Sequence, residues 1–338
     1  MSAAPALFAN PDAPAVAALL RPAAADLFAS PAWYRTVLRH AMPVGSAAVF
    51  AALPGALLAL RAGPGRRLDS LTTPYTCRWG PLAARDNPDA LATLLELCRG
   101  RAGTMRLEAL TEEQAAALAA AGRAAGFRPL PYRHFGNWHT PLGGREWDAY
   151  LADRPGALRG TLRRRMRPEL RLELLRTPGP ALEAGLAAYQ AVYARSWKRP
   201  EPYPGFNPAL ARALAEEGTL RLGLLHAPEG VVAAQFWALE GRRASVLKLA
   251  HDEAHRALSP GSVLTALMIR RLIGEDEVDE IDFGRGDDAY KQLWAEQRRQ
   301  RMGLLLADPH RPTGLAALAH AALARATLTC RLSRRGGG

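Results

Sequence analysis

The sequence has only three cysteines and no long uninterrupted apolar run. Cys77, Cys98 and Cys330 form no CxxC pair, so neither a disulfide framework nor a zinc site is indicated, and a reducing cytoplasmic compartment is expected. Each apolar window of about 20 residues is interrupted by a charged residue or a histidine, so no membrane-spanning helix is predicted. Residues 1–26 lack an early basic region and predict a flexible lead-in, not a signal peptide.

The composition is that of a globular chain with an excess of positive charge. Its 338 residues are 49% hydrophobic, which suits two domains or one large one with a substantial core. The net charge of +12 favours anionic partners such as phosphorylated cofactors, nucleic acid or an anionic membrane. Much of this charge is arginine in an Ala-, Gly- and Pro-rich chain, a bias that a GC-rich genome produces without selection for binding. Charge alone therefore selects no partner.

The apolar spacing predicts the same order of elements twice. The first half contains a capped helix at 27–41, two strands around the Pro54–Gly55 turn, and then helix, strand, helix and strand at 88–100, 104–110, 112–125 and 127–142. The second half is predicted as strand 171–176, helices 181–198 and 208–218, strands 219–226, 230–240 and 242–251, helix 262–274, strand 278–284, helix 287–297 and strand 301–307.

This order favours an α+β fold. An antiparallel meander followed by a crossover helix and a further strand gives a mixed, mostly antiparallel sheet with helices on both faces. We interpret the chain as two copies of one fold, the first degenerate. The expected organisation is a flexible lead-in at 1–26, domains at 27–144 and 145–308, and a C-terminal helix with a basic tail at 309–338.

The segment HRALSPGSVLTAL (255–267) has the features of a phosphate-binding loop. Ser259 is a good N-cap, Pro260 suits the first helical position, and Gly261 lets a ligand approach the backbone. Free N–H groups from Gly261 to Leu264 can then hold a pyrophosphate, with His255 and Arg256 just upstream. The alternative is an ordinary capped helix.

The segment IDFGRGDDAYKQLW (281–294) places Asp282 at the end of a strand and acidic residues at the start of the next helix. Those acids suit the positive helix end. Tyr290 and Trp294 share a helix face. Lys291 beside them either points to solvent or serves an anionic group or developing oxyanion.

The segment YARSWKRPEPYPGF (193–206) is a helix end followed by a Pro-rich aromatic loop. Trp197, Lys198 and Tyr203 can form the wall of an acceptor site with Glu201 as a base, or the aromatic residues can simply cover the core. The Arg-rich stretch 154–176 is either a phosphate or nucleic-acid surface or a solvated basic helix, and no RNA- or DNA-binding motif accompanies it.

Together, SWKRPE, YPGF, VVAAQFWALEG, SVLKLAHDEAHRALSPGSVLTALMI and EIDFGRGDDAYKQLW resemble GNAT-fold N-acetyltransferases of the CelD-like type, which are related to the FemAB peptidyltransferases. The resemblance covers residues 145–307 and, more weakly, 27–140. It implies tandem GNAT-like domains and transfer of an acyl group to an amine. The donor is acyl-CoA, such as acetyl-CoA, or aminoacyl-tRNA in FemAB relatives.

The resemblance also implies site roles. The acyl-CoA pyrophosphate belongs at Arg256, Ser259, Pro260, Gly261 and Ser262, although RALSPGS departs from the usual Q/RxxGxG/A loop. The family's lysine after an aromatic residue, here Lys291, stabilises the oxyanion. No coiled-coil insertion of tRNA-dependent relatives is apparent.

These implications lead to a hypothesis for the whole site. Glu201 or Asp282 deprotonates the acceptor amine, no metal takes part, and a cysteine nucleophile is disfavoured. The substrate is expected to contact Trp197, Lys198, Tyr203, Lys248 and Tyr290. The acceptor is expected to be a small-molecule, sugar or lipid-linked amine of cell-envelope or exopolysaccharide metabolism, and nucleic acid is not an expected partner.

Other possibilities remain at this stage. The donor can be an acyl carrier protein, and the protein can be a tRNA-dependent peptidyltransferase or a non-catalytic GNAT-fold binding protein. The C-terminal helix either packs on the domain or rests on an anionic membrane, which would place a cytoplasmic protein at the periphery of the inner membrane.

Overall fold

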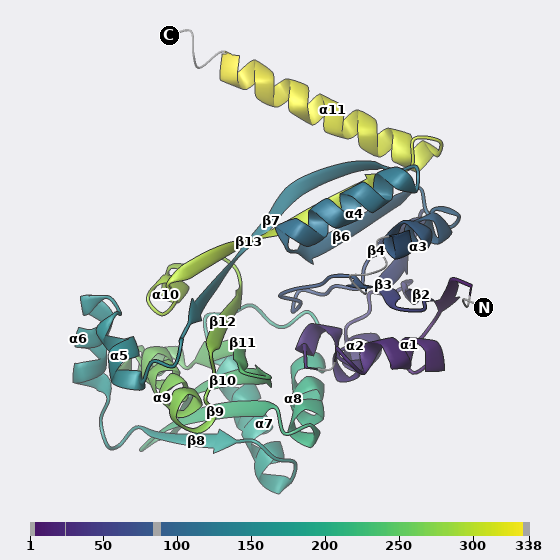
Figure 1. The fold of residues 1–338 in the computed structure, drawn as a ribbon. Helices are drawn as coiled ribbons and strands as arrows, with labels where there is room; N and C mark the ends of the chain where they lie inside the picture. The colour runs from purple at the N-terminus through teal and green to yellow at the C-terminus, as the bar shows by residue number, and fades with distance from the viewer. Residues whose placement is uncertain (1–3, 24, 84–88, 334–338) are drawn as a thin grey trace. The chain divides into compact units, whose positions relative to one another are not determined.

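The structure is a computed structural model that describes residues 4–23, 25–83 and 89–333, with side chains to residue 324 (Figure 1). The chain forms two compact units that are not contiguous in sequence. Unit 1 draws on the ranges 1–23, 42–135 and 300–338, and unit 2 on 24–41 and 136–299. These units differ from contiguous domains at 27–144 and 145–308.

Unit 1 is a sheet in the order β1-β2-β3-β4-β6-β13 with helices. All neighbours in this order are antiparallel except β4 and β6, which are parallel, and β5 pairs with β3. Its elements are β1 (Ala6–Phe8), α1 (Pro14–Leu20), β2 (Ala47–Leu53), β3 (Ala56–Gly63), β4 (Arg67–Ser70), β5 (Leu82–Ala83), α3 (Asp89–Arg99), β6 (Thr104–Leu110), α4 (Glu112–Ala124), β7 (Arg128–Pro141, which continues into unit 2), β13 (Gln297–Ala307, which begins in unit 2) and α11 (Pro312–Ser333).

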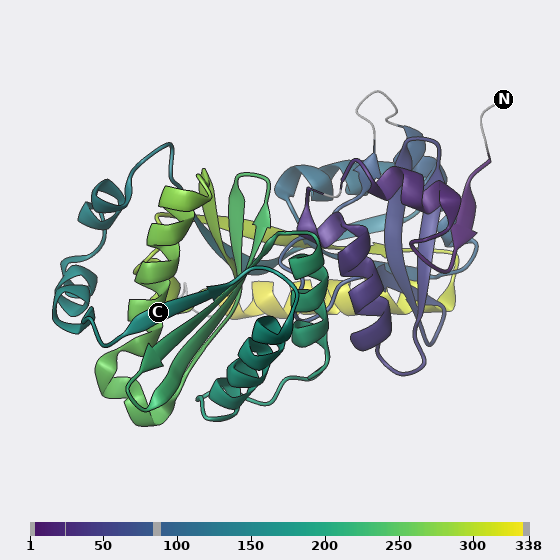
Figure 2. The ribbon, with the colours of Figure 1, turned by 90° about the horizontal axis from the view of Figure 1, so that it is seen from below.

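Unit 2 is a sheet in the order β7-β12-β11-β10-β9-β8. Figure 2 shows α9 on one face of this sheet and α7 and α8 on the other. Its elements are η1 (Leu27–Ala29), α2 (Pro31–His40), α5 (Trp147–Ala152), α6 (Gly156–Arg165), β8 (Arg171–Leu175), α7 (Pro180–Ala194), α8 (Phe206–Glu216), β9 (Leu220–Ala227), β10 (Gly230–Glu240), β11 (Arg243–His251), η2 (Glu253–Leu258), α9 (Pro260–Glu275), β12 (Glu280–Arg285) and α10 (Ala289–Gln292).

The predicted repeat is confirmed by the pairing of the strands. In unit 2 the antiparallel meander β9-β10-β11 is followed by α9 and by β12, which runs parallel to β11. In unit 1 the meander β2-β3-β4 is followed by α3 and by β6, which runs parallel to β4. Both sheets are therefore mixed and mostly antiparallel, as the sequence predicts.

Helix α2 shows why the unit boundaries differ from the prediction. The Ser30 hydroxyl caps it as expected, accepting a hydrogen bond from the Trp33 backbone N–H at 3.1 Å. The Trp33 ring then packs edge-on against Phe206 of α8, with ring centroids 5.4 Å apart. This buried aromatic contact joins residues 24–41 to the second half of the chain.

Two predictions about local structure are wrong. The flexible lead-in instead contains β1, paired with β2, and α1, which buries Val16 and Leu20 completely one turn apart on one face. The helix expected at 287–297 is only the single turn α10. Its continuation is prevented because the Trp294 carbonyl accepts hydrogen bonds from Tyr150 and Arg154, at 2.7 and 2.8 Å.

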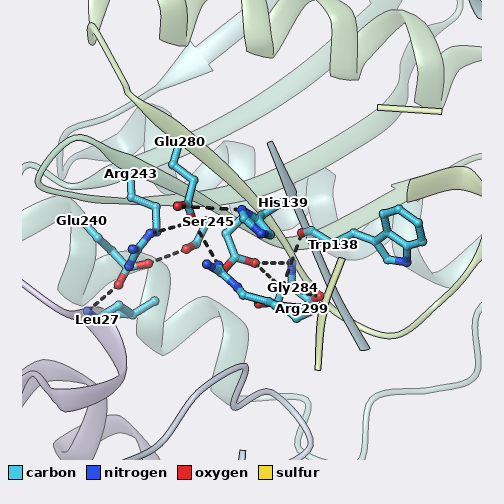
Figure 3. Close-up of polar contacts among 11 residues, drawn as sticks. Leu27, Trp138, His139, Glu240, Arg243, Ser245, Glu280, Gly284 and Arg299 are labelled. Atoms are coloured by element: carbon cyan, nitrogen blue, oxygen red, sulfur yellow. Dashed lines mark hydrogen bonds and ion pairs between the residues drawn. The ribbon is translucent and has the colours of Figure 1, made fainter. Parts of the chain in front are cut away.

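A buried charged network fixes β12 against the neighbouring strands (Figure 3). The Asp282 carboxylate, 1% exposed, accepts hydrogen bonds from the Asn137 amide and the Gly284 N–H, each at 2.7 Å, and pairs with Arg299 at 2.5 Å. Arg299 also donates to Glu280 at 3.0 Å and to the Asn137 oxygen at 2.6 Å. The Asp282 carboxylate therefore has a structural role, since its buried charge is compensated by Arg299 and by hydrogen bonds from Asn137 and Gly284.

We predict that Arg299→Met destabilises the protein by about 3–5 kcal/mol, because it leaves the Asp282 carboxylate buried without its cation. Urea denaturation measures the effect. The neighbouring Arg298→Met is the matched control, since Arg298 forms an exposed pair with Asp287 worth about 1 kcal/mol or less. Equal stability of the two variants would contradict the structural role of the network.

Candidate functional site

The site begins where β11 separates from β12. The two strands pair only at residues 243–245 with 280–282. Beyond Ser245 the register of β11 with β10 skips Leu247, since Phe236 faces Lys248 and Trp237 faces Val246. Strand β12 has its own irregularity after Asp282, where Gly284 adopts a φ of 69°. Residues 246–251 of β11 therefore have a backbone edge to which an extended ligand can hydrogen-bond.

The N-terminus of α9 lies beside the end of this edge. Pro260 and Gly261 are buried, and a Cβ at position 261 would lie 3.3 Å from His251 Nδ1, so the glycine permits a close approach. In the part of the chain that the structure describes, this His251 Nδ1 is enclosed and has no hydrogen-bond partner. Burial lowers the pKa of His251, which makes a neutral imidazole at pH 7.

The capping role predicted for Ser259 is wrong. Ser259 adopts a left-handed conformation with φ 51° and ψ 46°, and its hydroxyl makes no capping hydrogen bond. Its backbone carbonyl still accepts from the Val263 N–H at 3.1 Å. The first-turn N–H groups before Val263 have no intrahelical partner and remain suited to an anion. Arg256 is exposed on the preceding 3-10 helix η2.

Tyr290 fixes this helix start from α10. Its hydroxyl donates to the Gly261 carbonyl at 3.1 Å and lies 2.6 Å from Thr265 Oγ1. Burial raises the pKa of Tyr290, so the phenol stays protonated. The structure thus gives Tyr290 a positioning role at the α9 terminus, while its expected contact with substrate stays a prediction.

The loop after α7 contacts side chains of β11. Trp197 is 53% exposed and packs against His251, with ring centroids 4.4 Å apart and ring planes tilted by 41°. Lys198 Nζ lies 5.5 Å from the centre of the Trp197 ring. Glu201 reaches back to Lys248 of β11, with Oε1 and Nζ 2.7 Å apart. The predicted acceptor residues Trp197, Lys198, Glu201 and Lys248 are therefore brought together.

Lys291 approaches from α10. Its ammonium donates to the Arg285 carbonyl and lies 3.5 Å from the Asp288 carboxylate, and its side chain is 15% exposed. Asp288 also caps α10 by accepting from the Lys291 backbone N–H at 3.2 Å. Lys291 therefore does not extend freely into solvent, which was the alternative left open by the sequence.

The charged groups of the site act together on the pKa of Lys198. Burial lowers its pKa to about 8, and the charges of Lys248 and Lys291 act in the same direction. Glu201 and Asp288 raise the pKa of Lys198 and offset part of this effect. The loop after α7, strand β11 and helix α10 thus form one charged cluster, which we call the lysine cluster: Lys198, Lys248 and Lys291 with Glu201 and Asp288.

The remaining predicted residues lie outside these contacts. Asp282 is held in the buried network of Figure 3, where Arg299 donates to its carboxylate. Tyr203 is half-buried, and its carbonyl accepts from the Phe206 N–H at 3.0 Å in front of α8. His251 was not predicted as a site residue, because a histidine at the end of a strand carries no signal until the fold places it under Trp197.

The corresponding edge in unit 1 is occupied by the chain itself. After β4 and β6 pair at residues 67–69 and 104–106, the Trp79 backbone N–H donates to the Ala109 carbonyl at 3.0 Å, and its indole N–H donates to the Ala59 carbonyl at 2.9 Å. Trp79 thereby occupies a carbonyl of β6 beyond the paired residues, and its ring is buried. This gives a physical meaning to the degenerate first copy.

A family model for the acetyltransferase (GNAT) domain matches residues 156–292, which contain the open edge, the α9 terminus and the lysine cluster. No curated protein matches the sequence significantly. Residues 156–292 therefore resemble the acetyltransferase (GNAT) domain, and the chain has the GNAT-like fold, with its repeated topology, that the sequence resemblance implied.

Solved structures share this fold at low sequence identity. FemX aligns with a TM-score of 0.59 at 12% identity, over 83% of this chain and 92% of its own. The C-terminal domain of a putative lysylphosphatidylglycerol synthetase from Agrobacterium fabrum aligns with a TM-score of 0.55 at 14% identity, over 80% of this chain and 85% of that domain. L-PGS from Bacillus licheniformis aligns with a TM-score of 0.53 at 13% identity, over 80% of this chain and 86% of its own. The fold of this chain is thus similar to that of FemAB-like proteins.

Two structural absences apply to the described residues. No helix there has the length and apolar character needed to cross a bilayer. Likewise, the side chains described include no cluster of three or more His, Cys, Asp or Glu arranged to hold a metal ion.

Two serines test the interpretation of the α9 start. We predict that Ser259→Ala changes the free energy of unfolding by less than about 0.5 kcal/mol, because the hydroxyl caps nothing. Ser30→Ala is expected to cost about 1–2 kcal/mol, because Ser30 caps α2 and is 2% exposed. Chemical denaturation of both variants compares them, and a Ser259→Ala cost equal to that of Ser30→Ala would restore the capping role.

Proposed function

We propose that the protein is an N-acyltransferase that transfers an acyl group from acyl-CoA to an amine. The observation that carries this proposal is the open edge of β11 ending beside the N-terminus of α9. An extended pantetheine chain can hydrogen-bond to a strand edge, and a pyrophosphate suits unpaired N–H groups at a helix start. Arg256 supplies a cation for the remaining phosphate charge, and His251 Nδ1 supplies a polar atom that needs a partner.

The lysine cluster supplies the chemistry at the other end of the donor. When the acceptor nitrogen attacks the thioester carbonyl, negative charge develops on the carbonyl oxygen. The Lys291 ammonium, held by the Arg285 carbonyl and Asp288, is a fixed positive group that can stabilise this oxyanion. Backbone N–H groups of β11 can add to that stabilisation. The reaction needs no covalent intermediate on the protein.

The two carboxylates first considered as bases are poor candidates in this arrangement. Glu201 is paired with Lys248 at 2.7 Å, and Asp282 with Arg299 at 2.5 Å. A cation beside a carboxylate favours its charged form and weakens it as a proton acceptor. Glu201 fits better as the group that positions Lys248, and Asp282 as part of the β12 scaffold.

A second donor class is supported by the surface of α6. Arg159, Arg163 and Arg164 are exposed on this helix, and Arg167 is exposed just after it. Such a basic surface suits a polyanionic donor such as aminoacyl-tRNA. Binding that neutralises several phosphates weakens steeply as salt concentration rises, whereas binding of CoA depends on fewer charges. A steep salt dependence would therefore favour the tRNA-dependent alternative.

The donor site is tested by thermal unfolding with CoA, acetyl-CoA and longer acyl-CoAs. We predict that a saturating ligand raises Tm by several degrees, because binding to the native state stabilises it by mass action. The variant with Arg256→Ala and Ser259→Ala is expected to lose this shift. Arg270→Ala is the matched control, since it removes an exposed arginine from α9 far from the N-terminus of that helix. No shift at millimolar ligand would contradict an acyl-CoA donor.

The oxyanion role is tested at Lys291. We predict that Lys291→Met lowers kcat by about 10²-fold or more, because it removes a charge aimed at the transition state. Release of free thiol from acetyl-CoA, measured with a panel of primary amines, reports the rate. Gln292→Ala, at the exposed next position of α10, is the control. An unchanged kcat in Lys291→Met would remove this lysine from the mechanism.

A further inference from the structure

Lysine is rare in this chain, and its distribution is not random. Of the 44 basic residues other than histidine, 41 are arginine and only three are lysine. These three are Lys198, Lys248 and Lys291, which come from a loop, a strand and a helix that are distant in sequence. All three belong to the lysine cluster described above, and no lysine occurs anywhere else in the chain.

Elsewhere in the chain, arginine provides the positive charge at positions where either arginine or lysine could do so. Its buried ion pairs are built on arginine, as between Arg221 and Asp276 or between Arg299 and Asp282. Arginine binds anions in a bidentate manner and does not lose its proton in proteins. Lysine differs in that its amine can become neutral when buried. Three lysines at one place therefore indicate that the site needs an amine that can give up its proton.

The contacts single out Lys198 among the three. Lys248 Nζ forms an ion pair with Glu201 Oε1 at 2.7 Å, and Lys291 Nζ forms one with Asp288 Oδ2 at 3.5 Å. Among the residues that the structure describes, no carboxylate lies within ion-pair distance of Lys198 Nζ, which instead faces the Trp197 ring. Two ammonium groups act on it from β11 and α10. Its positive form is thus the least compensated of the three.

The other titratable groups around this position do not supply the missing charge. Tyr193 of α7 stays protonated, because burial and then Glu201 raise its pKa, and its hydroxyl donates to the Arg199 carbonyl at 3.1 Å. His251, whose ring contacts Trp197, is neutral at pH 7 because burial lowers its pKa. Burial, followed by the charge of Lys248, therefore lowers the pKa of Lys198, and Glu201 and Asp288 offset only part of this effect.

Resting on the proposed function, we propose that Lys198 is the catalytic base: its neutral amine takes the proton that the acceptor nitrogen loses on attacking the thioester. In this step the N–C bond forms, the C–S bond breaks, and CoA leaves as the thiolate. The proton moves from the acceptor nitrogen to Lys198 Nζ, and from there to the thiolate or to solvent. The products are an amide and a thiol.

This proposal gives the other members of the cluster distinct tasks. Lys248 and Lys291 disfavour the ammonium form of Lys198, and Lys291 also faces the oxyanion. Glu201 holds Lys248 in place. The site thereby has a base and two fixed cations on the same type of side chain: Lys248 and Lys291 each have a carboxylate partner, and Lys198 is the base.

The first test does not depend on an acceptor. Reductive methylation with ¹³C-formaldehyde labels only the three lysines and the N-terminal amine, and single Lys→Arg variants assign the resonances. We expect the Lys198 signal to titrate near pH 8, against about 10.4 for an unperturbed lysine. Lys291→Met should move this titration upward, and Glu201→Gln should move it downward. Titration of Lys198 near 10.4 would overturn the proposal.

The second test measures acyl transfer from acetyl-CoA to the best primary amine of the panel as a function of pH. Lys198→Arg keeps the charge but cannot accept the proton, so kcat should fall by about 10²-fold or more, with loss of the limb near pH 8 and little change in the KM for acetyl-CoA. Arg199→Lys, the exposed neighbour, is the control and should keep the profile of the parent protein.

The outcomes separate the two proposals. A Lys198→Arg variant with the parent rate and pH profile would overturn the base while leaving the acyltransferase standing. A variant that raises only the KM for the acceptor would make Lys198 a binding group and also overturn the base. No thiol release with any amine would overturn the proposed function, and the base with it, whatever the titration of Lys198 shows.

Discussion

The divergence of β11 from β12 is the constraint on which the site depends. Two parallel strands normally continue to pair, but here the pairing stops after Ser245 and Asp282. Each strand has an irregularity just beyond that point, at Leu247 in β11 and near Gly284 in β12. A bulge re-aims the residues that follow it. The strand edge that could bind a donor exists because β12 is turned away and held there by the Asp282 network.

The contrast with unit 1 shows that this divergence alone does not make a site. The same meander and parallel crossover occur there, yet Trp79 is bonded to both sides of the sheet region, with its backbone N–H donating to Ala109 of β6 and its indole N–H donating to Ala59 of β3. The chain itself thus satisfies a carbonyl of β6 beyond the point where β4 and β6 stop pairing. The duplication supplies two similar frameworks, and local side chains decide which one remains open to a ligand.

Much of the fold could be predicted from the sequence because its signals are local. The Pro54–Gly55 turn, the Ser30–Pro31 helix start and the meander in the second half each follow from short-range chemistry, and each is present. The errors arise where tertiary contacts prevail. Helix α10 ends early because the Trp294 carbonyl accepts hydrogen bonds from Tyr150 and Arg154. The lead-in forms regular structure because Val16 and Leu20 are buried in the core.

The candidate site was predictable only in part for the same reason. Segments around Ser259, Lys291 and Lys198 could be singled out by motif, but the left-handed backbone of Ser259 and the ring contact of Trp197 with His251 could not. The pairing of Glu201 with Lys248 joins a loop to a strand and has no local signature. Asp282 resembled a site residue because it ends a strand before a glycine turn, and only the fold shows that Arg299 neutralises it.

A single electrostatic arrangement serves several needs of the proposed reaction. The N-terminus of α9 and the three lysines make the region positive, which favours a pyrophosphate, a developing oxyanion and a departing thiolate. Burial, together with this field, lowers the pKa of Lys198 and favours its neutral amine. Arginine in place of these lysines would keep the field but lose the proton acceptor. In a chain that otherwise uses arginine, the three lysines lie where the proposed reaction requires both charge and proton transfer.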